Sequence, residues 1–262
     1  NSEDKIMEVE ILGCSGGIGV GLRTTSILIN SNLLIDAGTG VGDLPLTRMK
    51  QIRHLFLTHT HLDHIISLPF MADNMITTPG EYLNIYALPE SIAILKKHIM
   101  NWDIWPDFTK IPTPENPVLR LHEVSPGTMI EMDGVSIEMV PVNHVVPTVG
   151  YYLKNIEGSG SFLFSGDTTT NESLWDFLNS RPPVDELIVE CSFMNKDREL
   201  SLLAKHYNPE LLAEDLKKLN YKPNVRISHL KPGIENELMD QCKRALPNMD
   251  VYKLERGDIF EI

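Results

Sequence analysis

The sequence is poor in cysteine and has no long apolar run, and both shortages exclude classes of protein. Its 262 residues include three cysteines, Cys14, Cys191 and Cys242, which lie far apart and never in C-x-x-C spacing. This argues against a disulfide-rich secreted scaffold and against a thiolate zinc finger, so we expect reduced thiols in a cytoplasmic protein. No apolar run approaches the length of a membrane span, so we expect no membrane contact.

The N-terminal stretch also lacks the features of a secretion signal. NSEDKIMEVEILG has neither the basic start nor the apolar core of a signal peptide. The first residue is not Met, and we therefore expect that the chain was trimmed or cut from something longer.

Positive charge is scarce as well. There are 23 Lys and Arg against 36 Asp and Glu, which gives a formal net charge of −13. Proteins that grip long nucleic acid neutralise phosphates with Lys and Arg, so the acidic balance argues against long nucleic acid as the main partner. The length and the 42% hydrophobic content suit a domain with a sizeable core. Composition leaves the oligomeric state open, with a homodimer as one alternative.

Apolar runs separated by turns predict strands in both halves of the chain, and each half ends in helices. We expect strands at 7–12, 26–30, 33–36, 54–58, 83–88, 118–124, 135–142, 149–154, 161–167, 186–191, 224–230, 250–254 and 258–262. Helical spacing and helix-start residues are found at 40–51, where we expect a short helix broken near Pro45, and at 61–76, 89–100, 208–219 and 235–245. The pattern predicts one α/β domain over residues 1–262, with two packed sheets and helices outside. The aromatic, proline-rich stretch around 100–117 is expected to be a lid or insertion.

The heptapeptide THTHLDH at 58–64 carries four side chains that can bind metal. They are His59, His61, Asp63 and His64. A solvated surface has no need of this crowding, and an apolar core would be destabilised by it. Imidazole and carboxylate groups are ligands for zinc, iron or manganese, so the heptapeptide predicts a metal site.

Three distant residues share the same local pattern, an apolar strand that ends in a possible ligand. They are His144 in MVPVNH, Asp167 in SFLFSGD and His229 in NVRISH. Ligands gather beyond the strand ends of α/β folds, where a rigid scaffold positions the loops. If these loops meet, His59, His61 and His144 form one site, Asp63, His64 and His229 form a second, and Asp167 bridges them.

In this order of motifs the sequence resembles the metallo-β-lactamase superfamily. The resemblance covers nearly the whole chain: LGCSGG after the first strand, LLIDAG, HTHLDH, and then His144, Asp167 and His229. It implies a four-layer αββα sandwich and a binuclear metal hydrolase. Zinc is the first expectation for the two divalent ions, with iron and manganese as alternatives.

The tail is similar to the phosphodiesterase branch, which holds class II cyclic-nucleotide phosphodiesterases and ribonuclease Z. That branch has a histidine before a helix ahead of the last metal histidine, a position that His206 takes here. Asn208 is expected to cap this helix and Pro209 to begin it. HTHLDHIISL and SHLKPG match the cyclic-nucleotide enzymes, whereas PFMAD departs from their signature. Ribonuclease Z has Gly where Leu62 stands, and the chain has no basic Gly-Pro-rich arm.

The resemblance implies a phosphodiesterase with a small-molecule phosphodiester substrate, which converts 3′,5′-cyclic nucleotides to 5′-nucleotides. Hydroxide formed on the two metals would attack phosphorus. Asp63 or Asp167 would orient this nucleophile, and His206 would protonate the departing 3′-oxygen. The alternatives are a ribonuclease Z-like RNA phosphodiesterase and a non-hydrolytic di-iron oxygen or redox sensor. A glutamate stands in the oxygen-binding relatives where this chain has His61, which argues against the sensor. A degenerate scaffold that only binds partners is the last alternative.

Other polar and aromatic residues are expected to be structural. Asp36 should brace the metal loop without binding metal. The glycine-rich run 13–21 lacks the motifs of a nucleotide cradle and should form a turn near the metal pocket. Three histidines have no evident partners and are expected to be structural: His54, His98 and His122. Three aromatic residues of the 100–117 stretch are expected to pack it against the body of the protein: Trp102, Trp105 and Phe108.

Overall fold

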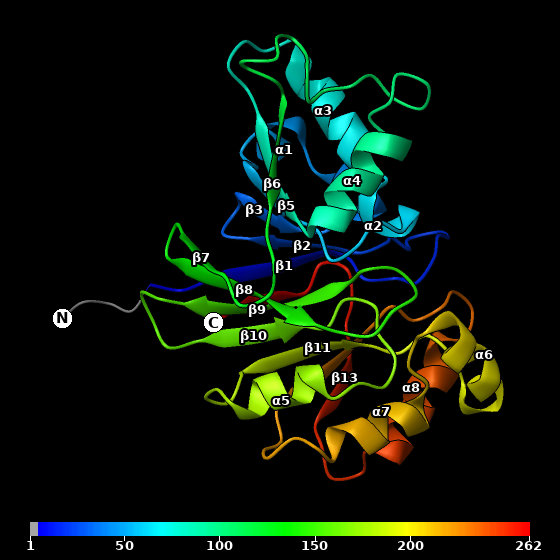
Figure 1. The fold of residues 1–262 in the computed structure, drawn as a ribbon. Helices are drawn as coiled ribbons and strands as arrows, with labels where there is room; N and C mark the ends of the chain where they lie inside the picture. Colours follow the sequence, from blue (N-terminus) through cyan, green and yellow to red (C-terminus); the bar gives the residue numbers. More distant parts are fainter. Residues whose placement is uncertain (1–4) are drawn as a thin grey trace.

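Strands from the two halves of the chain pair into two sheets that lie face to face. The computed structural model describes residues 5–262, and Figure 1 shows the sheets at its centre. The first sheet has seven strands in the order β14-β1-β2-β3-β4-β5-β6. These strands are β1 (Glu8–Gly13), β2 (Ser26–Ile29), β3 (Leu33–Ile35), β4 (His54–Phe56), β5 (Leu83–Ala87), β6 (Leu119–Glu123) and β14 (Ile259–Glu261).

The second sheet also has seven strands, in the order β13-β12-β11-β10-β9-β8-β7. They are β7 (Met129–Met132), β8 (Val135–Pro141), β9 (Val149–Asn155), β10 (Ser161–Phe164), β11 (Glu186–Glu190), β12 (Asn224–Ser228) and β13 (Val251–Lys253). The first half of the chain therefore forms the first sheet and the second half forms the second, except that β14 returns to pair with β1 in the first sheet.

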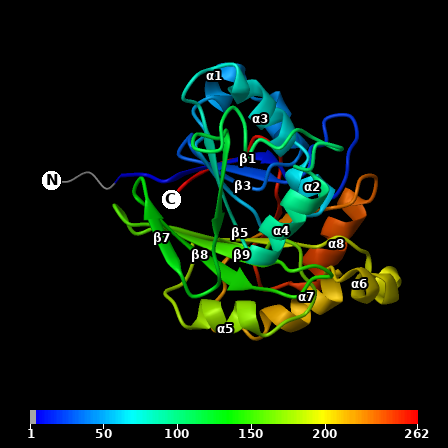
Figure 2. The ribbon, with the colours of Figure 1, turned by 45° about the horizontal axis from the view of Figure 1, so that its top comes forward.

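Helices cover the outer face of each sheet (Figures 1 and 2). The first sheet is covered by elements of the first half: η1 (Thr39–Asp43), α1 (Leu46–Met49), α2 (Leu62–Ile65), α3 (Leu68–Ile76) and α4 (Pro89–His98). The second is covered by α5 (Ser173–Asn179), α7 (Pro209–Leu216) and α8 (Glu235–Ala245), and the segment before α7 forms η2 (Asn195–Asp197) and α6 (Arg198–Ala204). The order of layers is helices, sheet, sheet, helices.

Three hydrophobic clusters fill the spaces between these four layers. In β3, Leu34 packs towards the helices, while Leu33 and Ile35 pack towards the second sheet. In β10, Leu163 packs towards the helices and Phe162 towards the first sheet. Side chains of a strand alternate between its two faces, so strands buried on both faces read as continuous apolar runs. This explains why runs such as LLI and SFLF predicted buried strands.

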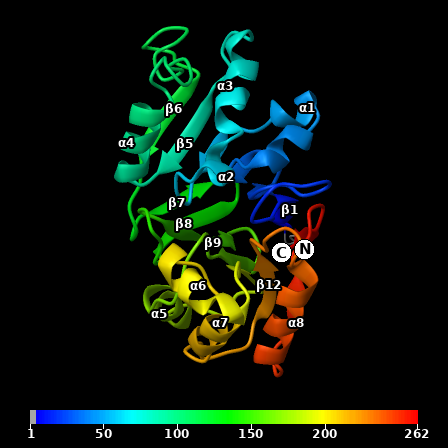
Figure 3. The same ribbon diagram turned by 90° about the vertical axis from the view of Figure 1, so that its right-hand side faces the viewer.

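Parallel pairing brings the chemically active loops to one edge. β3, β4, β5 and β6 are parallel in the first sheet, and β10, β11, β12 and β13 are parallel in the second. Because parallel strands end at the same side, the segments after β4, β10, β11 and β12 meet there. Figure 3 faces this edge, with α2 and α6 in view.

The structure confirms the predicted fold class, the four-layer αββα sandwich, and departs from the predicted elements in detail. The helix expected at 61–76 is two helices, α2 and α3. The sequence prediction did not include β7, α5 and α6. The helix expected at 40–51 does break at Pro45, between η1 and α1. No helix among residues 5–262 has the length and apolar character to cross a bilayer. Residues 1–4 of the stretch examined for a signal peptide lie outside the described residues.

The aromatic stretch around 100–117 contains no helix or strand longer than an isolated bridge. Phe108 is buried in the cluster between the first sheet and its helices, and Trp105 packs against that cluster and against Phe70. Trp102 is instead 60% exposed. Two of the three aromatic side chains therefore have the packing role expected of them, whereas a role of this stretch as a lid stays a prediction.

Candidate metal centre

The heptapeptide follows β4 after one residue, Leu57, and leads into α2. His59 and His61 lie on the short connection, and Asp63 and His64 lie in the first turn of the helix. Thr58, His59 and His64 are completely buried, while the side chain of Asp63 is 31% exposed. The loop therefore points its imidazoles into the molecule and leaves one side of the cluster open at Asp63.

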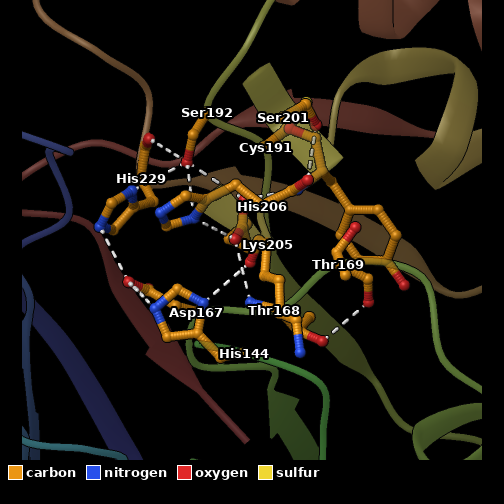
Figure 4. Close-up of polar contacts among 12 residues, drawn as sticks. His144, Asp167, Thr168, Thr169, Cys191, Ser192, Ser201, Lys205, His206 and His229 are labelled. Atoms are coloured by element: carbon orange, nitrogen blue, oxygen red, sulfur yellow. Dashed lines mark hydrogen bonds and ion pairs between the residues drawn. The ribbon is translucent and has the colours of Figure 1, made fainter. Parts of the chain in front are cut away.

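The second sheet contributes the other three residues from its strand ends. His144 follows β8, Asp167 follows β10, and His229 directly follows β12 (Figure 4). The backbone of His229 has a φ of 61°, in the left-handed region that non-glycine residues rarely adopt. Its amide donates to the carbonyl of Cys14 over 2.8 Å, which holds this conformation against the first sheet.

The side chains predicted from the sequence lie together in two groups that share Asp167. In each group the possible ligand atoms lie within 4.8 Å of one another. The groups are His59, His61, His144 and Asp167, and then Asp63, His64, Asp167 and His229. This is the division that the sequence predicted; that these residues bind metal is taken up as a proposal below.

Asp167 lies between the groups. Its Oδ2 atom is 3.2 Å from His64 Nε2, 3.4 Å from His229 Nε2 and 3.5 Å from His59 Nε2. His144 Nε2 is farther, at 3.9 Å. A single carboxylate oxygen thus faces imidazoles of both groups.

Four of the histidines use Nδ1 to bond outward and direct Nε2 into the cluster. The Nδ1 contacts are His59 to Thr58 Oγ1 (2.9 Å), His64 to Asp36 Oδ2 (2.7 Å), His144 to the carbonyl of Lys205 (2.8 Å) and His229 to Ser192 Oγ (2.9 Å). In a neutral imidazole, each of these contacts places the proton on Nδ1 and leaves a lone pair on Nε2. Metal-binding histidines in proteins show this outer hydrogen bond.

Buried atoms without partners agree with this interpretation. Within the part of the chain that the structure describes, His59 Nε2 and His64 Nε2 are buried and accept no hydrogen bond. His144 Nε2 and His61 Nδ1 face each other over 3.2 Å. A buried polar atom without a partner is costly, and a cation held between these nitrogens would satisfy their lone pairs. The residues present therefore fit two divalent ions.

The two groups differ in the pKa values of their buried imidazoles. Burial, aided by His64, lowers the pKa of His59 to about 3, so this imidazole is neutral. Burial opposes the charged form of His64, but the carboxylates of Asp167 and Asp36 outweigh it and raise the pKa of His64. Burial likewise opposes the charge of Asp167, and His229 and His64 overcome it and lower the pKa of Asp167. The carboxylates of the cluster stay ionised, as cation binding requires.

Asp36 and the glycine-rich run support the cluster from outside. Asp36 is fully buried and accepts from the amide and hydroxyl of Thr58 and from His64 Nδ1. A Cβ on Gly16 would lie 2.7 Å from the carbonyl oxygen of His229. The contacts of Asp36 match a bracing role, and the run 13–21 forms a turn packed against His229, as the sequence predicted.

His206 lies beside the cluster. Its ring stacks on His229, with centroids 5.1 Å apart, and meets His144 edge-on at 4.9 Å. It comes just before α7, where Asn208 accepts from the amide of Leu211 over 2.8 Å as the expected helix cap. The predicted placement of His206 next to the metal residues is therefore observed.

Sequence reasoning missed Glu190, at the end of β11. Its Oε1 atom accepts from His206 Nδ1 over 2.6 Å, and its Oε2 atom accepts from Ser192 Oγ over 3.1 Å. Burial opposes the charged form of His206, but Glu190 outweighs it and raises the pKa of that imidazole. Asp167, Glu190 and His206 also form a third group of close acidic and imidazole atoms. ELIVE shows the same strand-end pattern as the other sites, and this signal could have identified Glu190.

The histidines expected to be structural lie elsewhere. His54 bonds Tyr86 and His122 bonds Asn84, both on the first sheet, and neither belongs to the groups of possible metal ligands. His98 is in the last turn of α4, where a basic side chain suits the helix dipole.

Comparison with known proteins agrees with this fold. A family model described as "Beta-lactamase superfamily domain" matches residues 31–245. A protein of Yersinia pestis named "Probable 3′,5′-cyclic-nucleotide phosphodiesterase" is 25% identical, over 87% of this chain and 79% of its own. Ribonuclease Z of Crocosphaera subtropica is 28% identical over 60% of this chain and 50% of its own. The crystal structure of unliganded yeast PDE1 superposes with a TM-score of 0.82 at 18% identity, covering 98% of this chain and all of that one.

Proposed function

This chain belongs to the metallo-β-lactamase superfamily, and we propose that it is a binuclear metal-dependent phosphodiesterase that hydrolyses 3′,5′-cyclic nucleotides to 5′-nucleotides. The observation that carries the proposal is the pair of ligand groups joined by Asp167, with His206 beside them. The relative named as a cyclic-nucleotide phosphodiesterase aligns with most of both chains, which supports the substrate class.

The proposed ligands are the seven residues of the two groups: His59, His61, Asp63, His64, His144, Asp167 and His229. Divalent ions held there, with zinc as the first candidate, would supply an acidic water at neutral pH and stabilise charge on the phosphate oxygens. The structure supports neutral His59 and ionised Asp63 and Asp167 as ligands, because burial keeps the imidazole uncharged and neighbouring imidazoles favour the carboxylates.

The chain's own residues divide the remaining work. Asp63 and Asp167 orient the attacking water, since both carboxylates face the cluster and Asp63 reaches solvent. His206 protonates the departing 3′-oxygen from Nε2, because its Nδ1 proton is held by Glu190. Glu190 keeps this imidazole charged and fixes its ring orientation.

The RNA phosphodiesterase is the second candidate, since ribonuclease Z also aligns with part of the chain. The net charge of −13 disfavours it, because tRNA binding relies on phosphate neutralisation. The oxygen or redox sensor is disfavoured by His61, an imidazole in place of the glutamate of those relatives.

The test compares cyclic AMP, cyclic GMP and bis(p-nitrophenyl) phosphate as substrates of metal-quantified protein, with chelator-treated protein as the control. We expect turnover of a cyclic nucleotide that chelator abolishes and added metal restores. Activity on the generic diester alone would refute the substrate assignment and retain the metal chemistry. No turnover with two irons bound per chain would favour the sensor.

A further inference from the structure

A second buried carboxylate, Asp215 on α7, collects hydrogen bonds from the segments that carry the reacting residues. The residue is 1% exposed. Its donors are Thr170 Oγ1 (2.8 Å), the amide of Asn171 (3.1 Å), Trp175 Nε1 (3.1 Å), the hydroxyl of Tyr207, and Lys218 Nζ (2.9 Å). Thr170 and Asn171 follow Asp167, and Tyr207 follows His206 directly.

The same two segments are also joined by Glu190. The amide of Thr168 donates to Glu190 Oε1 over 3.0 Å, and the amide of Tyr207 donates to Glu190 Oε2 over 3.2 Å. Segments 167–171 and 206–207 are thus tied at one end by Glu190 and at the other by Asp215. Glu190 contacts His206 itself, whereas Asp215 acts only through its donors.

We propose that Asp215 is a positioning residue that fixes the Asp167 segment relative to His206. The inference rests on the proposed function. Asp167 comes from β10 and His206 from the α6–α7 connection, so packing of each element alone does not set their separation. Misplacement of reacting groups by about 1 Å can cost a hundredfold in rate. A tie between the two segments is therefore a requirement of a reaction that uses both residues.

A carboxylate suits this role because it only accepts hydrogen bonds. Both Asp215 oxygens are engaged, Oδ1 by Thr170 and Lys218 and Oδ2 by Tyr207, Asn171 and Trp175. The side chain of an asparagine has one acceptor oxygen and one NH₂ group, which is a donor. At one of the two positions its NH₂ group would therefore face other donors and could not accept their hydrogen bonds. Bonds to an ionised acceptor are also stronger than neutral ones.

The experiment compares wild type with Asp215→Asn in two measurements. One is zinc titration of the metal-free protein by calorimetry, and the other is kcat and KM for a cyclic nucleotide. We expect zinc affinity and kcat each to fall about tenfold, the lower end of the loss for direct partners of metal ligands, because Asp215 reaches the ligand segment only through its donors. KM should change less than about threefold. Glu138→Gln is the matched control, because it makes the same chemical change at a buried carboxylate whose partner is Arg181. It should leave zinc affinity and kcat unchanged.

Thr170→Val tests the same tie if Asp215→Asn does not fold, because it removes a single donor to Oδ1. It should change zinc affinity and kcat in the same direction by a smaller factor. In a double-mutant cycle, the effects of Asp215→Asn and Tyr207→Phe on kcat should be non-additive, since both substitutions alter the same hydrogen bond, from the Tyr207 hydroxyl to Asp215.

A variant that loses thermal stability but keeps wild-type zinc affinity and kcat would overturn the proposal and leave Asp215 a purely structural residue. The proposed function fails separately, if wild-type protein hydrolyses no phosphodiester. The zinc titration still tests the positioning of Asp167 in that case, because it requires no substrate.

Discussion

The proton on His206 Nε2 is the residue-scale feature on which the proposed leaving-group step depends. Its Nδ1 atom is bonded to Glu190 at 2.6 Å, so Nε2 is the atom available to a departing oxygen. General acids of this kind contribute about a hundredfold to ten-thousandfold in rate. The size of this contribution depends on how basic the leaving group is.

We predict that His206→Ala lowers kcat for a cyclic nucleotide by about that factor and changes hydrolysis of bis(p-nitrophenyl) phosphate much less. Nitrophenolate departs without a proton, whereas a ribose 3′-oxygen needs one. His122→Ala, on the first sheet away from the cluster, is the control and should behave as wild type. Equal losses on both substrates would argue that His206 is a structural neighbour of the metal residues.

The Cys14 thiol gives a pH prediction that is independent of the metal. Burial, aided by Asp258, raises its pKa to about 12. At pH 9 only about a thousandth of the thiol is then ionised, and the thiolate is the reactive form. We predict that alkylation of Cys14 in the folded protein rises about tenfold per pH unit up to pH 11. In urea-unfolded protein, where the thiol has its ordinary pKa, the alkylation rate should level off above about pH 9. A rate that also levels off above pH 9 in the folded protein would contradict the prediction. Mass spectrometry of peptides identifies the site.

The residues that sequence could identify are those at the ends of strongly apolar strands. His144, Asp167 and His229 follow such runs, and the structure brings them to the heptapeptide. Asp215 could not be identified in this way. It lies in the last turn of α7, and its partners are set by the packing of α7 against the loop after β10.

At the scale of elements, the turn after β1 sets the position of the last predicted ligand. Gly16 lies so close to His229 that an added Cβ would be 2.7 Å from its carbonyl oxygen and 3.0 Å from its Nδ1. Heavy atoms at 2.7 Å must move apart. The movement would displace a residue whose backbone already has a positive φ.

We predict that Gly16→Ala weakens zinc binding by about tenfold or more, as loss of an outer partner of a ligand does. Gly42→Ala is the matched control, because a Cβ on Gly42 meets nothing within 4 Å. Calorimetric titration with zinc compares the two variants. Wild-type affinity in Gly16→Ala would mean that His229 is not held by this turn.

The elements that sequence analysis missed have physical reasons. β7 is a four-residue edge strand with alternate residues exposed, and its MIEM sequence shows no regular alternation of apolar and polar residues. α6 exposes Leu200, Leu202 and Leu203, so its apolar residues form no buried face. Its end is held by a local contact, since Ser201 Oγ donates to the carbonyl of His206 over 2.6 Å. Strong periodicity predicted the long, buried elements, and these short, exposed ones carry no such signal.

At the scale of the whole molecule, the net charge of −13 separates the two phosphodiesterase candidates. We predict no measurable binding of tRNA at about 150 mM salt, because non-specific affinities of even basic proteins lie near 10⁻⁴–10⁻⁶ M there. Fluorescence anisotropy with labelled tRNA measures this. Micromolar binding that weakens steeply with salt would favour the ribonuclease Z-like alternative.

The most direct test of the account is titration of metal-free protein with zinc while turnover of a cyclic nucleotide is followed. Two ligand groups share Asp167, so activity should require both sites. We predict that turnover rises with added zinc and stops rising at two equivalents per chain. Full activity at one equivalent, or activity that persists in chelator, would contradict a binuclear phosphodiesterase.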